Sequence, residues 1–173
     1  LRAMGINTSL APTDSTVEAT LWAVRFPRIA MAIVVGAALA VAGAVMQAIF
    51  GNPLAEPGVV GISAGGALGA ALGIVLGITA FGAWTTAALA FFGALAATLL
   101  VYGVSRAGGR TEVVTLLLTG IAVNAFAGAG LAFLLFAADT GGREQIVFWQ
   151  LGSLNGSRWP EAGIVAAVLV VAG

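Results

Sequence analysis

The stretch 61-GISAGGALGAALGIVLG-77 places a glycine at every fourth position. In the interior of a helix in water, each glycine costs about 1 kcal/mol relative to alanine. In a lipid bilayer small residues are favourable at helix contacts, because they let two backbones approach closely and packing supplies the attraction. The spacing therefore predicts a membrane-embedded helix with a ridge for helix packing. The ridge consists of Gly61, Gly65, Gly69, Gly73 and Gly77.

The ridge winds around its helix. A step of four residues turns by about 400°, so successive glycines are displaced by about 40° and one straight partner could not cover them all. We therefore expect several helices to surround this one. Other apolar segments favour the same kind of packing, with Gly36 and Gly43 seven positions apart and Gly120 and Gly128 flanking Asn124. The alternative is that the small residues line a path for a solute, and the spacing favours packing.

The composition is that of a membrane protein. Hydrophobic residues make up 60% of the chain and charged residues 8%, whereas a soluble domain carries about 25% charged residues. The net charge is zero, so there is no basic surface of the kind that binds nucleic acid. The chain has neither cysteine nor histidine, which excludes disulfides, thiol chemistry and the usual zinc sites.

Three long segments lack any charged residue: Ile29–Ala55, Pro57–Ser105 and Val113–Ala138. About 20 apolar residues cross the hydrocarbon core as a helix. The sequence therefore predicts an all-α integral membrane protein, a polytopic bundle of transmembrane helices. We expect four full spans and the start of a fifth, which is cut off at the chain end. They lie near 28–50, 58–80, 82–104, 113–138 and 160–173.

The segments that connect the predicted spans contain residues that interrupt helices or favour the membrane surface. The run 51-GNPLAEPG-58 must interrupt the helix, because proline and glycine break helical hydrogen bonding. Within the 139–160 connection, polar and bulky apolar residues alternate over 144–154. We predict a short interfacial helix there, with Trp149 and Trp159 at headgroup depth, and an irregular loop is the alternative. We expect residues 1–25 to form an extracytoplasmic segment that leads into the first span, and 1–173 to be part of a single transmembrane domain of a longer protein.

Few polar residues lie within the predicted spans, and none of them is ionisable. They are Gln47, Thr98, Thr119 and Asn124. A carboxylate-based proton relay or ion-coupled site therefore has no candidate. For Asn124 an interhelical hydrogen bond is favoured over a ligand contact. The chain has neither a Walker-type phosphate loop nor a catalytic constellation, so we expect no enzymatic activity and no cofactor in this chain.

The arginines give a first estimate of orientation. Four crossings place one group of arginines on one side of the membrane and leave Arg106 and Arg110 on the other. The larger group consists of Arg2, Arg25, Arg28, Arg143 and Arg158. The positive-inside rule places this larger group in the cytoplasm.

A series of motifs resembles one known family, the FecCD-like permeases of bacterial type II ABC importers, which carry iron–siderophore complexes, haem or cobalamin. The chain has Trp-x-x-Arg-x-Pro-Arg at 22–28, Gly-Ala-Ala-Leu-Ala at 36–40 and Met-Gln at 46–47. Asn-Pro-Leu-Ala-Glu-Pro-Gly follows at 52–58 and Gly-Ile-Ser at 61–63. The segments 116-LLLTGIAVN-124 and 149-WQLGSLNGSRW-159 also match. The resemblance extends from Trp22 to the chain end, and the last segment is closer to the iron-complex branch than to the cobalamin branch.

The resemblance implies an assembly in the bacterial inner membrane. Two permease copies, identical or paired homologues, would join two cytoplasmic ATPase subunits, which bind ATP, and an extracytoplasmic solute-binding protein. Family topology places 22–28 and the 139–160 loop outside the cell, opposite to the charge rule. Arg25 and Arg28 would then dock the binding protein through its acidic residues.

The resemblance also implies a translocation path lined by the span 113–138, with Thr119, Asn124 and Gly128 as candidates. An inner gate would lie near Thr111 and Glu112. The implied function is that of a permease subunit for an iron complex, siderophore or haem. A cobalamin permease, an ion-coupled secondary transporter and a structural membrane subunit remain as alternatives.

Overall fold

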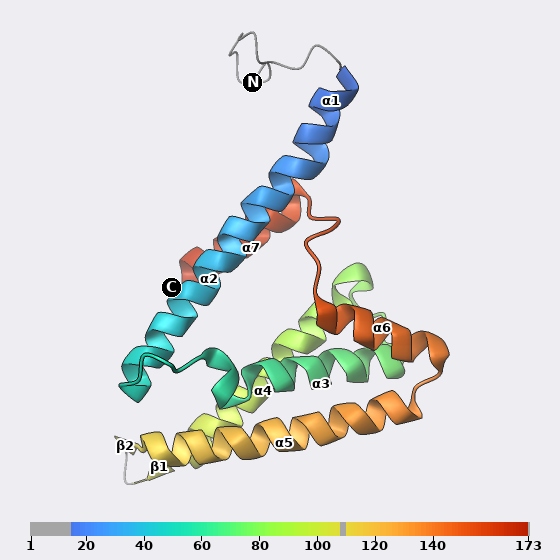
Figure 1. Cartoon of the computed structure of the whole chain (residues 1–173). Coiled ribbons are helices and arrows are strands. Elements are labelled where there is room, and N and C mark those ends of the chain that lie inside the picture. The colour runs from blue at the N-terminus through green and yellow to red at the C-terminus, as the bar shows by residue number, and fades with distance from the viewer. Residues whose placement is uncertain (1–14, 108–109, 173) are drawn as a thin grey trace. The chain divides into compact units, whose positions relative to one another are not determined.

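The computed structural model describes residues 15–107 and 110–172, and it is built almost entirely of helices (Figure 1). The α-helices are α1 (Ser15–Thr20), α2 (Phe26–Phe50), α3 (Ile62–Val75), α4 (Thr85–Val104), α5 (Val113–Ala137), α6 (Thr140–Leu151) and α7 (Trp159–Ala172). A π-helix, η2 (Leu21–Arg25), joins α1 to α2, and two 3₁₀ turns, η3 (Pro57–Val60) and η4 (Gly82–Trp84), precede α3 and α4. The paired strands β1 (Arg106–Ala107) and β2 (Arg110–Thr111) connect α4 to α5. The predicted all-helical class is confirmed, with this small hairpin as an addition.

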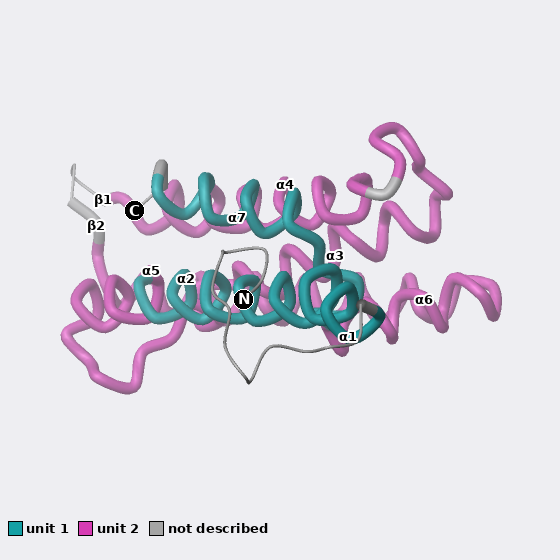
Figure 2. The backbone as a smooth tube through the Cα atoms, turned by 90° about the horizontal axis from the view of Figure 1, so that it is seen from above, with its two compact units in different colours: residues 1–41, 153–173 teal, residues 42–152 magenta. Residues whose placement is uncertain are grey.

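The chain divides into two compact units (Figure 2). One comprises residues 1–41 with 153–173, and its described part contains α1, η2, the first turns of α2, and α7. The other comprises residues 42–152 and contains the last turns of α2 and helices α3 to α6 with their connections.

Three described segments are long and apolar enough to cross a membrane: Thr16–Phe50, Thr85–Val104 and Val113–Ala137. The last two correspond to the predicted spans 82–104 and 113–138. The first is longer than the predicted 28–50, because α1, η2 and α2 follow one another as 35 continuous helical residues. Part of the predicted lead-in is therefore helical.

The predicted span 58–80 is a much shorter helix in the structure. α3 has only 14 residues, fewer than a membrane crossing needs. It starts after η3, where Gly61 adopts a left-handed φ of +86°, and it ends before Gly77, which has a φ of +62°. Residues with such a φ interrupt helical hydrogen bonding, and glycine adopts it without steric cost.

α3 lies against α4, α5 and α6, as expected for a helix with a winding ridge. A Cβ on Gly65 would lie 2.6 Å from the Ala97 Cβ and 2.7 Å from the Gly93 carbonyl oxygen. A Cβ on Gly69 would collide with the Leu89 carbonyl, and one on Gly93 with the Gly65 carbonyl. The α3 and α4 backbones are thus in direct contact.

The other members of the predicted ridge have different surroundings. A Cβ on Gly73 would collide with the Leu89 side chain, and one on Gly61 would lie 2.8 Å from a Val123 methyl carbon. A Cβ on Gly77 would meet no described heavy atom within 4 Å. It ends α3 instead of extending the ridge, which corrects the packing role predicted for it.

Two apolar clusters fill the 42–152 unit. Ala71 of α3, Leu134 and Ala138 at the end of α5, and Ile146 of α6 form one cluster. The second lies toward the other end of α5 and joins η3, α4 and α5; it consists of Val60, Val101 and Leu116, with Met46, Phe50, Ile62 and Val123 packed against it.

The 139–160 connection contains a helix, as predicted, and not an irregular loop. The Asp139 carboxylate accepts a hydrogen bond from the Gly142 N–H at 2.7 Å and caps the start of α6. The helix begins and ends earlier than the predicted 144–154. It begins at Thr140 because Asp139 caps its first turn, and it ends at Leu151 because Gly152, with a φ of +67°, follows.

Replacing Gly93 by alanine should separate α3 from α4. The new Cβ would collide with the Gly65 carbonyl, and we expect the free energy of unfolding in detergent to fall by about 1–3 kcal/mol. The matched control is Gly103→Ala on the same helix, where the added Cβ would meet no described heavy atom within 4 Å. This variant should be neutral or slightly stabilising. Equal losses in the two variants would contradict the backbone contact.

Candidate functional site

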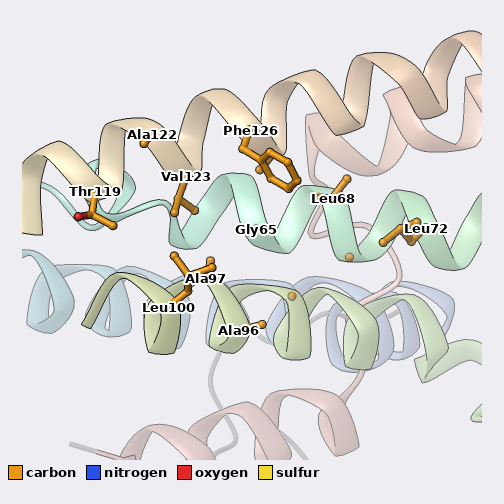
Figure 3. Close-up of a pocket in the computed structure, with 13 residues that line it drawn as sticks. Gly65, Leu68, Leu72, Ala96, Ala97, Leu100, Thr119, Ala122, Val123 and Phe126 are labelled. Carbon is orange, nitrogen blue, oxygen red and sulfur yellow. The ribbon is translucent and has the colours of Figure 1, made fainter. Parts of the chain in front are cut away.

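The 42–152 unit contains an apolar groove between α3, α4 and α5 (Figure 3). Its volume is about 690 Å³. Gly65, Gly69 and Gly93 line it where the backbones of α3 and α4 meet, and Phe126 contributes an aromatic ring from α5. Among the described residues that line it, Thr119 is the one with a polar side chain. The groove is therefore suited to an apolar surface.

Of the three predicted path residues, only Thr119 lies in this groove. Gly128 is exposed, and no described heavy atom lies within 4 Å of the position of its missing Cβ. Asn124 is half-buried, and its Nδ2 donates a hydrogen bond to the Gly58 carbonyl at 3.0 Å. The structure therefore does not bring the three residues together.

The hydrogen bond of Asn124 fixes α5 to the turn before α3. Gly120, one helical turn earlier, allows the same close approach, since a Cβ there would collide with the Val59 carbonyl. The contact agrees with the interhelical hydrogen bond favoured from the sequence. The Gly58 carbonyl also accepts a hydrogen bond from the Gly61 N–H at 3.1 Å within η3, so Asn124 is its second donor.

The residues predicted at the inner gate lie at the start of α5. Thr111 belongs to β2, where it pairs with Arg106 of β1, and its side chain lies outside the described part. The Glu112 N–H donates to the Ser105 carbonyl at 3.1 Å, and its carboxylate accepts from the Thr115 hydroxyl at 3.1 Å. Glu112 therefore ties both ends of the α4–α5 connection together.

The two predicted docking arginines lie in the other unit, at the junction of η2 and α2. Arg25 is the last residue of η2, and Arg28 is in the first turn of α2. Both side chains are exposed, and within the described residues neither forms an ion pair. They are therefore accessible to an acidic partner.

Sequence reasoning did not find two further features of these sites. The first is the set of groove-lining side chains from separate helices, such as Leu68 and Phe126. The second is an aromatic cluster beside the arginines, in which the Trp22 ring lies 5.6 Å from that of Trp159 and 5.5 Å from that of Phe26. The available signal was the apolar character of these residues, which many positions of the chain share.

Removing the Asn124 amide tests its structural role. Asn124→Ala should lower the free energy of unfolding by about 1 kcal/mol, measured by chemical unfolding in detergent. Thr119→Ala is the matched control, because the Thr119 hydroxyl lines the groove without a hydrogen bond to any described side chain or backbone atom of another element. Its unfolding free energy should stay within about 0.5 kcal/mol of the wild-type value. An unchanged stability of Asn124→Ala would show that the bond to Gly58 does not hold α5.

Comparison with known proteins agrees with this architecture. The model of the FecCD transport family matches residues 3–173. The cobalamin import system permease protein BtuC of Halobacterium salinarum is 40% identical over 159 residues, which cover 90% of this chain and 42% of that protein. The hemin transport system permease protein HmuU of Yersinia pestis is 39% identical over 151 residues, covering 86% of this chain and 45% of that protein.

A solved structure is also similar. It is described as a metal-chelate type ABC transporter in an inward-facing conformation, with 32% identity and a TM-score of 0.77, and the match covers 98% of this chain and 54% of the other. This chain thus spans less than half the length of the two curated relatives above. The resemblance seen in the sequence motifs is confirmed, and the chain belongs to the FecCD transport family as a multi-pass protein of the cell membrane.

Proposed function

We propose that this chain is part of the permease subunit of an ATP-driven type II importer. The observation that carries the proposal is the family match over residues 3–173. The likeness to an ABC transporter structure, at a TM-score of 0.77, supports it independently. In such an assembly the permease supplies the membrane path, and ATP is hydrolysed by a separate ATPase subunit.

We propose an iron complex, a siderophore or haem, as the transported substrate. The hemin permease of Yersinia pestis and the metal-chelate transporter structure support this choice. The cobalamin permease of Halobacterium salinarum has nearly the same identity to this chain, so cobalamin is the competing substrate. Haem, cobalamin and ferric siderophores are all large metal chelates, and a wide path between helices suits each of them.

The importer and its substrate are tested with the full-length protein, reconstituted in liposomes with its ATPase and binding protein. Uptake of haemin, a ferric siderophore and cobalamin is measured with ATP, with a non-hydrolysable analogue, and with an imposed ion gradient alone. Uptake of an iron complex that requires ATP supports the proposal. Uptake driven by the ion gradient would favour a secondary transporter, and absence of any uptake would favour a structural subunit.

We further propose that Arg25 and Arg28 dock the solute-binding protein. Their exposure and their freedom from ion pairs within the described residues support this role. An exposed ion pair contributes about 0–1 kcal/mol, so a docking surface requires several such pairs. Arg158, at the start of α7 in the same unit, is also exposed and is a third candidate. A second permease copy would supply the same set of arginines.

Charge reversal tests the docking role. The double variant Arg25→Glu, Arg28→Glu should weaken binding of the solute-binding protein by at least about tenfold, because two attractions become repulsions. The dependence of affinity on salt should also become flatter. Affinity is measured by surface plasmon resonance over a salt series. Arg106→Glu, in the α4–α5 connection, is the matched control and should leave affinity unchanged. Equal losses in both variants would contradict a specific docking surface.

A further inference from the structure

The junction between α1 and α2 is a π-helical turn, η2, in which one backbone carbonyl has no hydrogen-bond donor from its own helix. The Phe26 N–H donates to the Leu21 carbonyl, five residues earlier. Continuing that register, the carbonyl of Trp22 would accept a hydrogen bond from the N–H of residue 27. Residue 27 is proline, which has no N–H. The Trp22 carbonyl therefore has no donor within its own helix.

The missing donor is supplied by another helix. The indole N–H of Trp159, the first residue of α7, donates to the Trp22 carbonyl at 3.1 Å. The two indole rings also pack together, with centroids 5.6 Å apart and planes at 47°. The Phe26 ring lies edge-on to the Trp22 ring at 5.5 Å. The donor thus sits in an aromatic cluster built around the carbonyl that Pro27 leaves unpaired.

Trp159 is itself held in place by the start of its helix. The Glu161 carboxylate accepts a hydrogen bond from the Arg158 N–H at 2.5 Å, and the Ala162 N–H donates to the Arg158 carbonyl at 3.1 Å. Pro160 lies in the first turn, where its missing N–H costs nothing. Such a capped helix start fixes the backbone from which the indole extends.

We infer that Trp159 is a positioning residue: its indole N–H replaces the donor that Pro27 removes, and so holds the π turn that orients Arg25 and Arg28. The π turn holds one more residue than an α turn. Its loss would rotate the chain on one side of the turn by about 100° relative to the other. Arg25 lies in the π turn and Arg28 after it, so the direction of one guanidinium group relative to the other would change. The docking consequence rests on the proposed function, whereas the positioning itself does not.

A simpler role for Trp159 is that of an interfacial aromatic residue, because tryptophan is enriched at both membrane surfaces. That role would depend on the ring alone and would not depend on Pro27. Trp159→Phe retains an aromatic ring and removes the N–H. Trp149→Phe makes the same change on α6, where the Trp149 indole has no hydrogen-bond partner among the described residues, and it is the matched control.

The first measurement is amide hydrogen exchange over residues 21–28 in the full-length protein in lipid nanodiscs. Trp159→Phe should accelerate exchange of the Arg25 and Phe26 amides by roughly threefold to tenfold, the range expected for the loss of one hydrogen bond. Trp149→Phe should leave exchange in this segment unchanged. Unchanged exchange in Trp159→Phe would overturn the inference, whatever the effect on docking.

A second measurement asks whether the effect passes through the Trp22 carbonyl. Pro27→Ala restores an N–H at residue 27, so that this carbonyl regains a donor within the helix. In the Pro27→Ala background, Trp159→Phe should change exchange by less than about twofold, because the two changes act on one atom. An undiminished effect in that background would assign Trp159 a purely packing role and overturn the inference.

The docking consequence is measured separately, as affinity for the solute-binding protein. Trp159→Phe should weaken binding by roughly threefold to tenfold, although it removes neither arginine. Suppose that Trp159→Phe accelerates exchange but that neither it nor the Arg25→Glu, Arg28→Glu variant changes the affinity. This result would support the positioning role of Trp159 and would overturn the docking proposal. Unchanged affinity in Trp159→Phe alone, with a loss in the arginine variant, would overturn the positioning of the docking arginines.

Discussion

The direct contact between the α3 and α4 backbones is the constraint on which the 42–152 unit depends. At Gly65, Gly69 and Gly93 each helix occupies the space that a side chain of the other would need. Lipid offers no hydrophobic driving force between helices, so van der Waals contact of this kind provides the attraction. The groove follows from the same contact, because the glycines that join α3 and α4 also line it and leave its volume unfilled by side chains.

The irregular chain between α2 and α3 is stabilised by the few polar side chains near it. The Asn52 side-chain oxygen accepts a hydrogen bond from the Leu54 N–H at 2.9 Å, and Asn124 donates to the Gly58 carbonyl. Non-helical backbone at membrane depth is tolerated where protein groups satisfy it. The two asparagines thus supply side-chain hydrogen bonds to the connection that precedes the short α3.

Local chemistry explains which features could be predicted from the sequence. Helical segments follow from long charge-free runs, and the close contact at Gly65 and Gly69 follows from their spacing. Gly61 and Gly77 share that spacing but have positive φ, and a residue pattern cannot distinguish a glycine inside a helix from one that ends it. The contact of Trp22 with Trp159 depends on how distant segments fold together, which periodicity does not encode. Thr119 lines the groove, and its role in a translocation path stays a prediction. The spacing could not show that Asn124 bonds to η3.

The continuous helix Thr16–Phe50 has a consequence for the arginines. Its 35 residues extend about 52 Å at 1.5 Å per residue, while the hydrocarbon core is about 30 Å thick. All its charged residues lie at or before Arg28, and the remainder is about as long as the core is thick. The helix is therefore long enough for its first turns, up to Arg28, to extend beyond the apolar slab. In the docking role proposed above, a partner would meet cations that already lie on folded backbone, and little conformational entropy would be lost on binding.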